Sequence, residues 1–207
     1  MIDLSMLSYD EFVKYVFLHN NLYHKSEVND WKGDAQVILI YCIRLFKDGK
    51  ELWRRFEKER LHEGFDFISG SCGFFFLPAD PSASLDTGKQ FYESMAALFA
   101  DVFAIDPLQN VSFMWFERTT VWSLNRKSGK STIDDPVLRQ AMLAALRDIL
   151  RLPSKTCQMA ALHGLNELHH PEPRANIETI NEFLDAKLAI DCEVEEYARV
   201  CRGGRRQ

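Results

Sequence analysis

The segment from Asp135 to His170 constrains the fold most, because it has the pattern of two helices joined by a very short connection. Asp135 is a favourable N-cap, and Pro136 takes the first helical position, where its missing N–H costs no hydrogen bond. Leu152-Pro153 ends this helix, since the residue before a proline is disfavoured in the α region. Its apolar residues recur at helical spacing and form a wide stripe: Val137, Leu138, Ala141, Met142, Ala145, Leu146, Ile149 and Leu150.

The second helix of the pair begins after Ser154, which is a good capping residue. Its expected buried face consists of Cys157, Ala161, Leu165 and Leu168. Small residues at Ala160, Ala161 and Gly164 would let a neighbouring helix approach closely. A helical hairpin with such a face is a unit that stacks on others.

The C-terminal third has a regular spacing of predicted helix starts, near Pro136, Lys155, Arg174 and Cys192. The intervals between these positions are 19, 19 and 18 residues, so two helices span 19 + 19 = 38 residues. Repeats built from helical pairs have periods of about 34–47 residues. The spacing therefore predicts helical hairpins over residues 135–203.

Two strings in this region resemble the paired helices of a HEAT-like repeat: Asp135-Pro136-Val137-Leu138-Arg139 and Ala160-Ala161-Leu162-His163-Gly164-Leu165. The second string is also similar to one found in uncharacterised bacterial proteins with HEAT-like C-terminal halves. The resemblance covers about Asp135–Gly203. It implies stacked α-α hairpins and does not imply a particular activity.

The N-terminal part of the chain shows helical spacing at Tyr9–Asn20, Ala35–Lys47, Glu51–His62 and Gly88–Phe103. We therefore predict an all-α protein, an α-α helical array with HEAT-like hairpins at its C-terminal end. The expected organisation is a single domain over residues 1–207, in which helices of residues 9–62 pack on residues 88–124.

Two segments allow more than one interpretation. Residues Phe65–Leu77 could form a small β-hairpin, or a loop whose phenylalanines fill the core. In a third interpretation, Phe74, Phe75 and Phe76 form an exposed aromatic patch for a partner. Val111–Leu124 has strand-like composition, yet its apolar spacing and the N-cap Asn110 favour a helix, which we predict, followed by a polar loop at Asn125–Ile133.

The formal net charge of −5 disfavours a general nucleic-acid binder. The one dense basic segment, Arg54–Arg60, is interleaved with glutamates and is typical of a solvated helix face. The longest apolar run, Val37–Ile43, is far too short for a membrane span. Five cysteines without metal-type spacing, and the lack of a signal-peptide pattern, indicate the cytoplasm.

Histidine and glutamate offer one candidate metal site, at His163, Glu167 and His169. His163 and Glu167 are four residues apart and share a helix face, but the spacing differs from the His-Glu-x-x-His of zinc peptidases. The alternative interpretation is a polar rim residue at His163 and a helix C-terminus at His169-His170, where a positive imidazole complements the helix dipole.

Other catalytic patterns are weak. Cys72 lies between glycines, but no histidine is placed beside it by the sequence. Gly129-Lys130-Ser131 matches the end of a phosphate-binding loop, although Leu124 stands where that motif needs glycine. We expect no catalytic residue set and no bound cofactor.

The leading functional hypothesis is a non-enzymatic protein-interaction module, because stacked helical hairpins present extended surfaces that bind other proteins. By architecture and charge, an immunity-type or scaffold protein is one form of this hypothesis. The alternatives are a metal-binding protein or metal-dependent enzyme that uses His163, Glu167 and His169, and a nucleic-acid-associated helical repeat. We expect another protein as partner, and neither nucleic acid nor membrane.

Overall fold

The structure is a computed structural model that describes residues 1–18, 31–70, 73–121, 124–125, 130–131, 134–168, 173–186 and 190–203. Side chains are described within the same ranges, except from position 119 to position 133. The described residues form ten α-helices and four two-residue strands. The predicted all-α class is confirmed.

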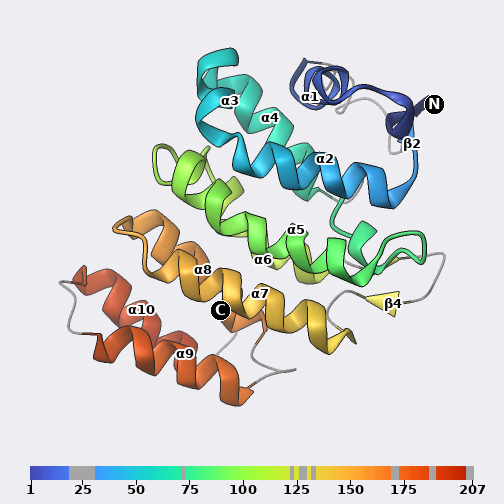
Figure 1. The fold of residues 1–207 in the computed structure, drawn as a ribbon. Coiled ribbons are helices and arrows are strands. Elements are labelled where there is room, and N and C mark those ends of the chain that lie inside the picture. The colour runs from blue at the N-terminus through green and yellow to red at the C-terminus, as the bar shows by residue number, and fades with distance from the viewer. Residues whose placement is uncertain are drawn as a thin grey trace.

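Four helices form a first layer: α2 (Ala35–Lys47), α5 (Leu85–Leu98), α7 (Pro136–Leu150) and α9 (Pro173–Asp185). Helix α5 packs between α2 and α7, and α9 contacts α7. Figure 1 shows these four helices following one another down the molecule and running in the same direction.

A second layer contains α4 (Lys58–Ser69), α6 (Val111–Val121), α8 (Lys155–Glu167) and α10 (Cys192–Arg202). Helix α6 packs on α4 and α8, and α10 packs on α8. Each helix of the second layer follows one of the first in the chain, so the described residues form a two-layer array of helical pairs. Helix α1 (Tyr9–Leu18) packs on α4, and α3 (Gly49–Arg55) connects α2 to α4.

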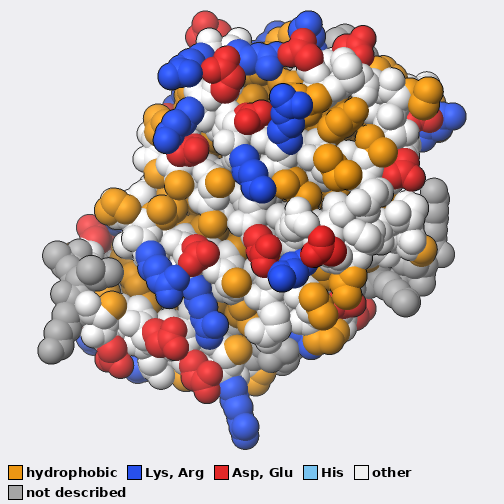
Figure 2. Space-filling model, viewed as in Figure 1, with side chains coloured by type: hydrophobic (Ala, Val, Ile, Leu, Met, Phe, Trp, Pro, Cys, Tyr) orange, Lys and Arg blue, Asp and Glu red, His pale blue; other side chains and the backbone are white. Residues whose placement is uncertain are grey.

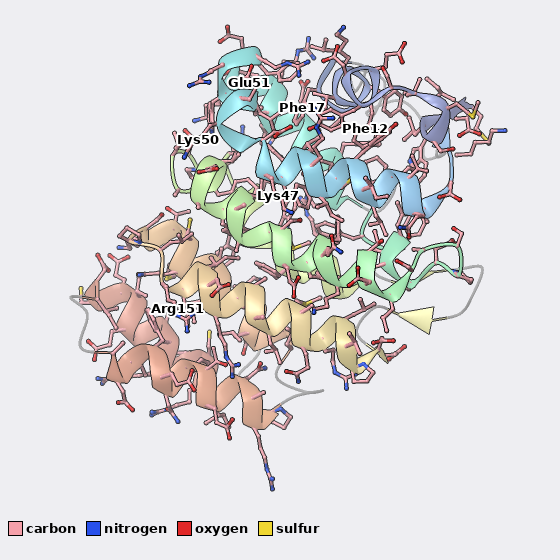
Figure 3. The ribbon with its side chains drawn as sticks, viewed as in Figure 1. Phe12, Phe17, Lys47, Lys50, Glu51 and Arg151 are labelled. Atoms are coloured by element: carbon pink, nitrogen blue, oxygen red, sulfur yellow. The ribbon has the colours of Figure 1, made fainter. Side chains whose placement is uncertain are left out.

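One hydrophobic cluster runs through the array and includes buried residues from all ten α-helices. Its largest fully buried side chains are Trp115, Tyr92, Phe12, Phe17, Phe46, Phe65, Phe74, Phe75, Phe91, Phe99, Phe103 and Phe116. Figure 3 labels two of them, Phe12 and Phe17, which come from the inner face of α1. The assignment of residues 1–207 to a single domain stays a prediction.

The C-terminal hairpins begin where the sequence places them. Helices α7, α8 and α10 start at Pro136, Lys155 and Cys192 as predicted, and α9 starts at Pro173, one residue early. Asp135, Ser154 and Asp191 each accept a backbone N–H in their helix's first turn. The expected close approach at Gly164 is also confirmed, because a Cβ there would meet Phe116 Cβ at 2.7 Å.

The β-hairpin considered for Phe65–Leu77 is wrong for the described part of this segment. Helix α4 continues to Ser69, and Leu77–Ala79 is a short 3-10 helix, η3. Gly64, which looks like a helix breaker, lies inside α4 because the Phe17 ring occupies the space of a side chain: a Cβ there would be 2.1 Å from Phe17 Cδ1. The glycine permits close packing and does not turn the chain.

The single helix predicted for Glu51–His62 is also wrong. The chain leaves the helix at Phe56, whose extended backbone (φ −133°) separates α3 from α4. The Phe56 ring packs on Phe17, with 4.9 Å between the ring centroids. This contact between distant segments explains why the local helical pattern does not continue.

The short strands lie elsewhere. Strand β1 (Ile2–Asp3) pairs in parallel with β2 (Trp31–Lys32), and β3 (Leu124–Asn125) pairs antiparallel to β4 (Lys130–Ser131). The second pair overlaps the segment predicted as a polar loop. Val111–Val121 is helical, which confirms the helix over the strand interpretation.

Helix α5 continues without a break into a π-helical turn, η4 (Phe99–Phe103). Leu108 and Gln109 then adopt left-handed backbone conformations, with φ of 48° and 57°. Asp106 supports this turn, because its carboxylate accepts the Leu108 N–H at 2.8 Å and pairs with Lys58 at 2.6 Å. None of the helices in the described ranges has both the length and the apolar character of a membrane span.

Candidate functional site

The second layer brings together polar side chains from three successive helices. His163 of α8 lies between Glu117 of α6 and Tyr197 of α10. Its Nδ1 is 3.1 Å from the Tyr197 hydroxyl, and its Nε2 is 3.1 Å from Glu117 Oε2. A single imidazole therefore bridges three helices that belong to three different hairpins.

The partners define the protonation of the neutral ring. A carboxylate can only accept hydrogen bonds, so Nε2 of the neutral imidazole must carry the proton and donate it in the hydrogen bond to Glu117. Nδ1 is then an acceptor, and the Tyr197 hydroxyl donates to it. Both ring nitrogens of His163 are thereby satisfied.

An aromatic contact covers the ring of His163. Phe113 of α6 stacks on the imidazole with a centroid distance of 4.4 Å and an interplanar angle of 16°. The Tyr197 ring lies 6.4 Å from Phe113. The side chain of His163 is 15% exposed and that of Glu117 35%, so the cluster is at the surface without being fully solvated.

We call this group the His163 surface and define it by Phe113, Glu117, His163, Glu167 and Tyr197. Burial raises the pKa of Tyr197, and nearby Cys201, Glu167 and Glu117 raise it further. These two carboxylates come from different helices, Glu117 from α6 and Glu167 from α8.

Burial keeps the cysteine and the tyrosine of this site in their neutral forms. Burial raises the pKa of the Cys201 thiol to about 11, although its hydrogen bond with Tyr197 lowers it. Thiolate, the nucleophilic form of cysteine, is therefore scarce at neutral pH. The Tyr197 hydroxyl is protonated for the same reason, because its pKa is raised by burial.

The polar contacts continue from α6 to α4. Arg118 Nη1 lies 2.5 Å from Asp66 Oδ1 and donates to Ser69 Oγ at 3.0 Å. Together with the bridge at His163, these bonds connect all four helices of the second layer.

The metal site predicted from the sequence is only partly described. His163 and Glu167 lie on α8, whereas His169 lies outside the described residues. Within the described part of the chain, no three His, Cys, Asp or Glu side chains group so that they could hold a metal ion. His163 uses both nitrogens for Tyr197 and Glu117, so a metal would have to displace one of these bonds.

The aromatic segment considered as a partner patch is mostly in the core. Phe74 is 0% exposed and Phe75 is 1% exposed. Phe76 is partly buried, and its ring stacks on Trp31 at 6.0 Å. Phe74 and Phe75 therefore offer no exposed surface to a partner in this structure.

The dense basic segment is compensated by carboxylates, as its sequence suggested. Arg54 pairs with Glu51 at 3.3 Å, and Arg60 with Glu63 at 2.7 Å. Arg55 pairs with Asp10 at 2.7 Å. Cys72 and Gly129 lie outside the described residues.

Sequence reasoning found His163 and Glu167 but missed the partners that define the site. Glu117 and Tyr197 are 46 and 34 residues from His163. Stacking of successive hairpins brings these residues together, and no short motif reports such a contact.

Comparison with known proteins adds no relative: no family model matches the sequence, no curated protein matches it, and no solved structure matches its fold. The class that the structure defines is a two-layer α-helical array. Its function has to be argued from its own surfaces.

Proposed function

We propose that this protein is a protein-interaction module that binds its partner through the His163 surface. The observation that carries the proposal is the bridge of Glu117, His163 and Tyr197 across three successive hairpins. Stacked helical pairs use surfaces of this kind, assembled from one helix of each pair, to bind other proteins.

The composition of the His163 surface supports this choice. Aromatic side chains are enriched at protein interfaces, and Phe113 and Tyr197 are both half-buried here. Their positions are fixed by the stack on His163 and the hydrogen bond to it, so little conformational entropy is lost on binding.

The first layer contrasts with this surface. Figure 2 shows acidic and basic side chains interspersed with apolar ones on the face that it presents. Arg151, labelled in Figure 3, pairs with Asp148 at the end of α7 at 2.7 Å, and Lys89 pairs with Glu93 within α5 at 3.6 Å. Exposed pairs of this kind are typical of a solvated face and contribute little energy.

We also propose that the protein acts in the cytoplasm. Cys42, Cys157, Cys192 and Cys201 are all free thiols, a state that suits a reducing compartment. The excess of acidic over basic residues favours a protein partner over nucleic acid.

The experiment is affinity purification of the tagged protein from the cells that make it, with two matched charge reversals. Glu167→Lys changes the His163 surface, whereas Glu178→Lys changes an exposed position of α9 in the first layer. We expect the same protein to co-purify with the wild type and with Glu178→Lys, and to be lost from Glu167→Lys.

Two results contradict the proposal. Equal recovery of the partner with both variants would place the binding surface elsewhere. Recovery of no protein with the wild type, under conditions where the chain is folded by circular dichroism, would remove the interaction itself.

A further inference from the structure

The His163 surface contains carboxylates without a cation of its own. Its five residues include Glu117 and Glu167 and no lysine or arginine. The basic residue next to Glu117 in the sequence, Arg118, pairs with Asp66 of α4. Glu167 forms no ion pair with a lysine or arginine in the part of the chain that the structure describes. The negative charge of this surface is therefore left to a partner.

Glu167 lies at a place in the fold where a positive charge is favoured. It is the last residue of α8, and the carbonyl groups at the C-terminal end of a helix carry partial negative charge. The last turn of α8 contains no lysine or arginine. Because Glu167 follows His163 by four residues, the two side chains are neighbours on the surface of α8. The carboxylate and the helix end thus add their negative potentials one turn from His163.

Other carboxylates of the second layer already have cations. Glu63 pairs with Arg60 at 2.7 Å, and Glu193 pairs with Lys155 at 2.7 Å. A basic partner would have to displace these side chains before it could form new ion pairs there. Among these carboxylates, Glu167 is the one that a partner can reach without breaking an ion pair.

Aromatic rings complete the His163 surface. Phe113 and Tyr197 are both half-buried, so part of each side chain remains open to solvent. The face of an aromatic ring attracts cations, and arginine can stack its planar guanidinium on a ring while its N–H groups bind a carboxylate. The lysine ammonium is a compact, strongly hydrated charge that cannot stack in this way. Rings beside carboxylates therefore suit arginine better than lysine.

We infer that the partner places an arginine of a basic protein segment on the His163 surface, with the guanidinium against the Tyr197 ring and its N–H groups toward Glu167. This inference rests on the proposed function and specifies the chemistry of the partner. Charge complementarity carries it, because the surface combines an unpaired carboxylate, a helix C-terminus and half-buried rings.

The test is nuclear magnetic resonance of the full chain, labelled at phenylalanine, tyrosine and histidine, with synthetic peptides as probes. The peptides have blocked ends and alternate glycine with arginine, lysine or glutamate. We expect the arginine peptide to shift the signals of Phe113, His163 and Tyr197, and the glutamate peptide to leave them unchanged. The lysine peptide should bind more weakly than the arginine peptide. Added salt should weaken binding, because it screens exposed charges.

Two matched variants locate the contact. Glu167→Gln removes the charge and keeps the size of the side chain, so it should weaken binding of the arginine peptide by about 2- to 5-fold. Glu178→Gln makes the same change at an exposed position of α9 and should leave the affinity unchanged. Circular dichroism of both variants checks that the fold is retained.

Three results would overturn the inference. They are the absence of shifts with the arginine peptide, equal affinities of the two variants, and a lysine or glutamate peptide that binds as tightly as the arginine peptide. The proposed function is judged separately, by the affinity purification. A protein that co-purifies with the wild type and is lost from Glu167→Lys would support that function even if the arginine peptide fails to bind.

Discussion

The two halves of the molecule are held together in different ways. The twelve largest fully buried side chains all precede position 117 and are all aromatic. Residues 134–207 contain one Phe, one Tyr and no Trp. There the helices pack through aliphatic and small residues, and polar side chains bridge neighbouring elements.

The N-terminal half relies on rings from segments that are distant in the chain. Phe17 of α1 contacts Phe56 and Phe65 with centroid distances of 4.9 and 5.3 Å. Phe12 stacks on Phe74 at 5.8 Å. These contacts determine where α3 ends and where α4 accommodates a glycine. The helix boundaries of the N-terminal half therefore depend on residues that are distant in the sequence.

The C-terminal half relies on neighbouring hairpins. Asn176 of α9 donates to the Leu165 carbonyl of α8 at 2.6 Å, and Arg147 of α7 donates to Thr179 of α9 at 2.9 Å. Lys155 pairs with Asp191 and Glu193 at the start of α10. Each of these bonds joins adjacent helical pairs. A few polar contacts between neighbouring pairs therefore help to hold the stacked hairpins together.

The largest expected effect comes from removing a ring of the N-terminal half. Phe17→Ala should lower the free energy of unfolding by about 4 kcal/mol, because a fully buried ring is lost and a cavity remains. Chemical denaturation measures this, with Leu18→Ala, at a position 45% exposed, as the control that changes it by less than about 0.5 kcal/mol. A loss below about 1 kcal/mol for Phe17→Ala would break the comparison.

A smaller loss of stability is expected where Gly64 of α4 packs against the Phe17 ring. Gly64→Ala should cost about 2 kcal/mol, because the new Cβ would be 2.1 Å from Phe17 Cδ1. In a Phe17→Ala background the same change should cost nothing, since the ring is absent. Gly88→Ala is the matched control, because its closest contact would be the end of the Leu138 side chain at 3.0 Å, and Pro78 would lie at an ordinary 3.4 Å. Additive losses in the double variant would contradict this account.

In the C-terminal half, Asn176→Ala should cost about 1.5 kcal/mol, because it removes a buried donor from the Leu165 carbonyl. Thermal and chemical denaturation both report this loss. Asn181→Ala, on the same helix and half-buried, should have little effect, since its bond to Arg202 is 3.4 Å long. Equal losses of stability for the two variants would show that the buried hydrogen bond from Asn176 to Leu165 contributes no more than the exposed one.

The smallest effect concerns pH. Burial raises the pKa of Asp106, but the Lys58 ammonium and the Leu108 N–H outweigh it, and the pKa is lowered overall. The contribution to stability is therefore present above the ordinary carboxyl pKa of about 3.9 and is lost as pH falls through the lowered value. Asp106→Asn should flatten the dependence of stability on pH below about pH 4. An unchanged dependence of stability on pH in the Asp106→Asn variant would contradict a stabilising role of the ionised Asp106.

The same contrast explains how much could be predicted from the sequence. In the C-terminal half, caps such as Asp135 and Ser154 and the repeated apolar spacing are local signals, so helix starts were predicted to within one residue. In the N-terminal half, the helix was predicted to end at His62, before Gly64, because nothing nearby in the sequence reveals the Phe17 ring that faces this glycine.

The candidate site was predictable only in part. His163 and Glu167 share a helix face by spacing alone, which is why both were considered. Glu117 and Tyr197 join them through stacking across hairpins, and this contact also accounts for both nitrogens of His163. A spacing rule within one helix cannot supply partners from two others.

The measurement that tests the central claim most directly is photo-crosslinking from the two layers. A photo-reactive residue replaces Glu167 at the His163 surface in one protein and Glu178 of α9 in a matched one, and both are irradiated in extract of the cells that make the protein. We predict one crosslinked protein from position 167 and none from position 178. Crosslinking from position 178 alone would contradict the assignment of the second layer as the binding face.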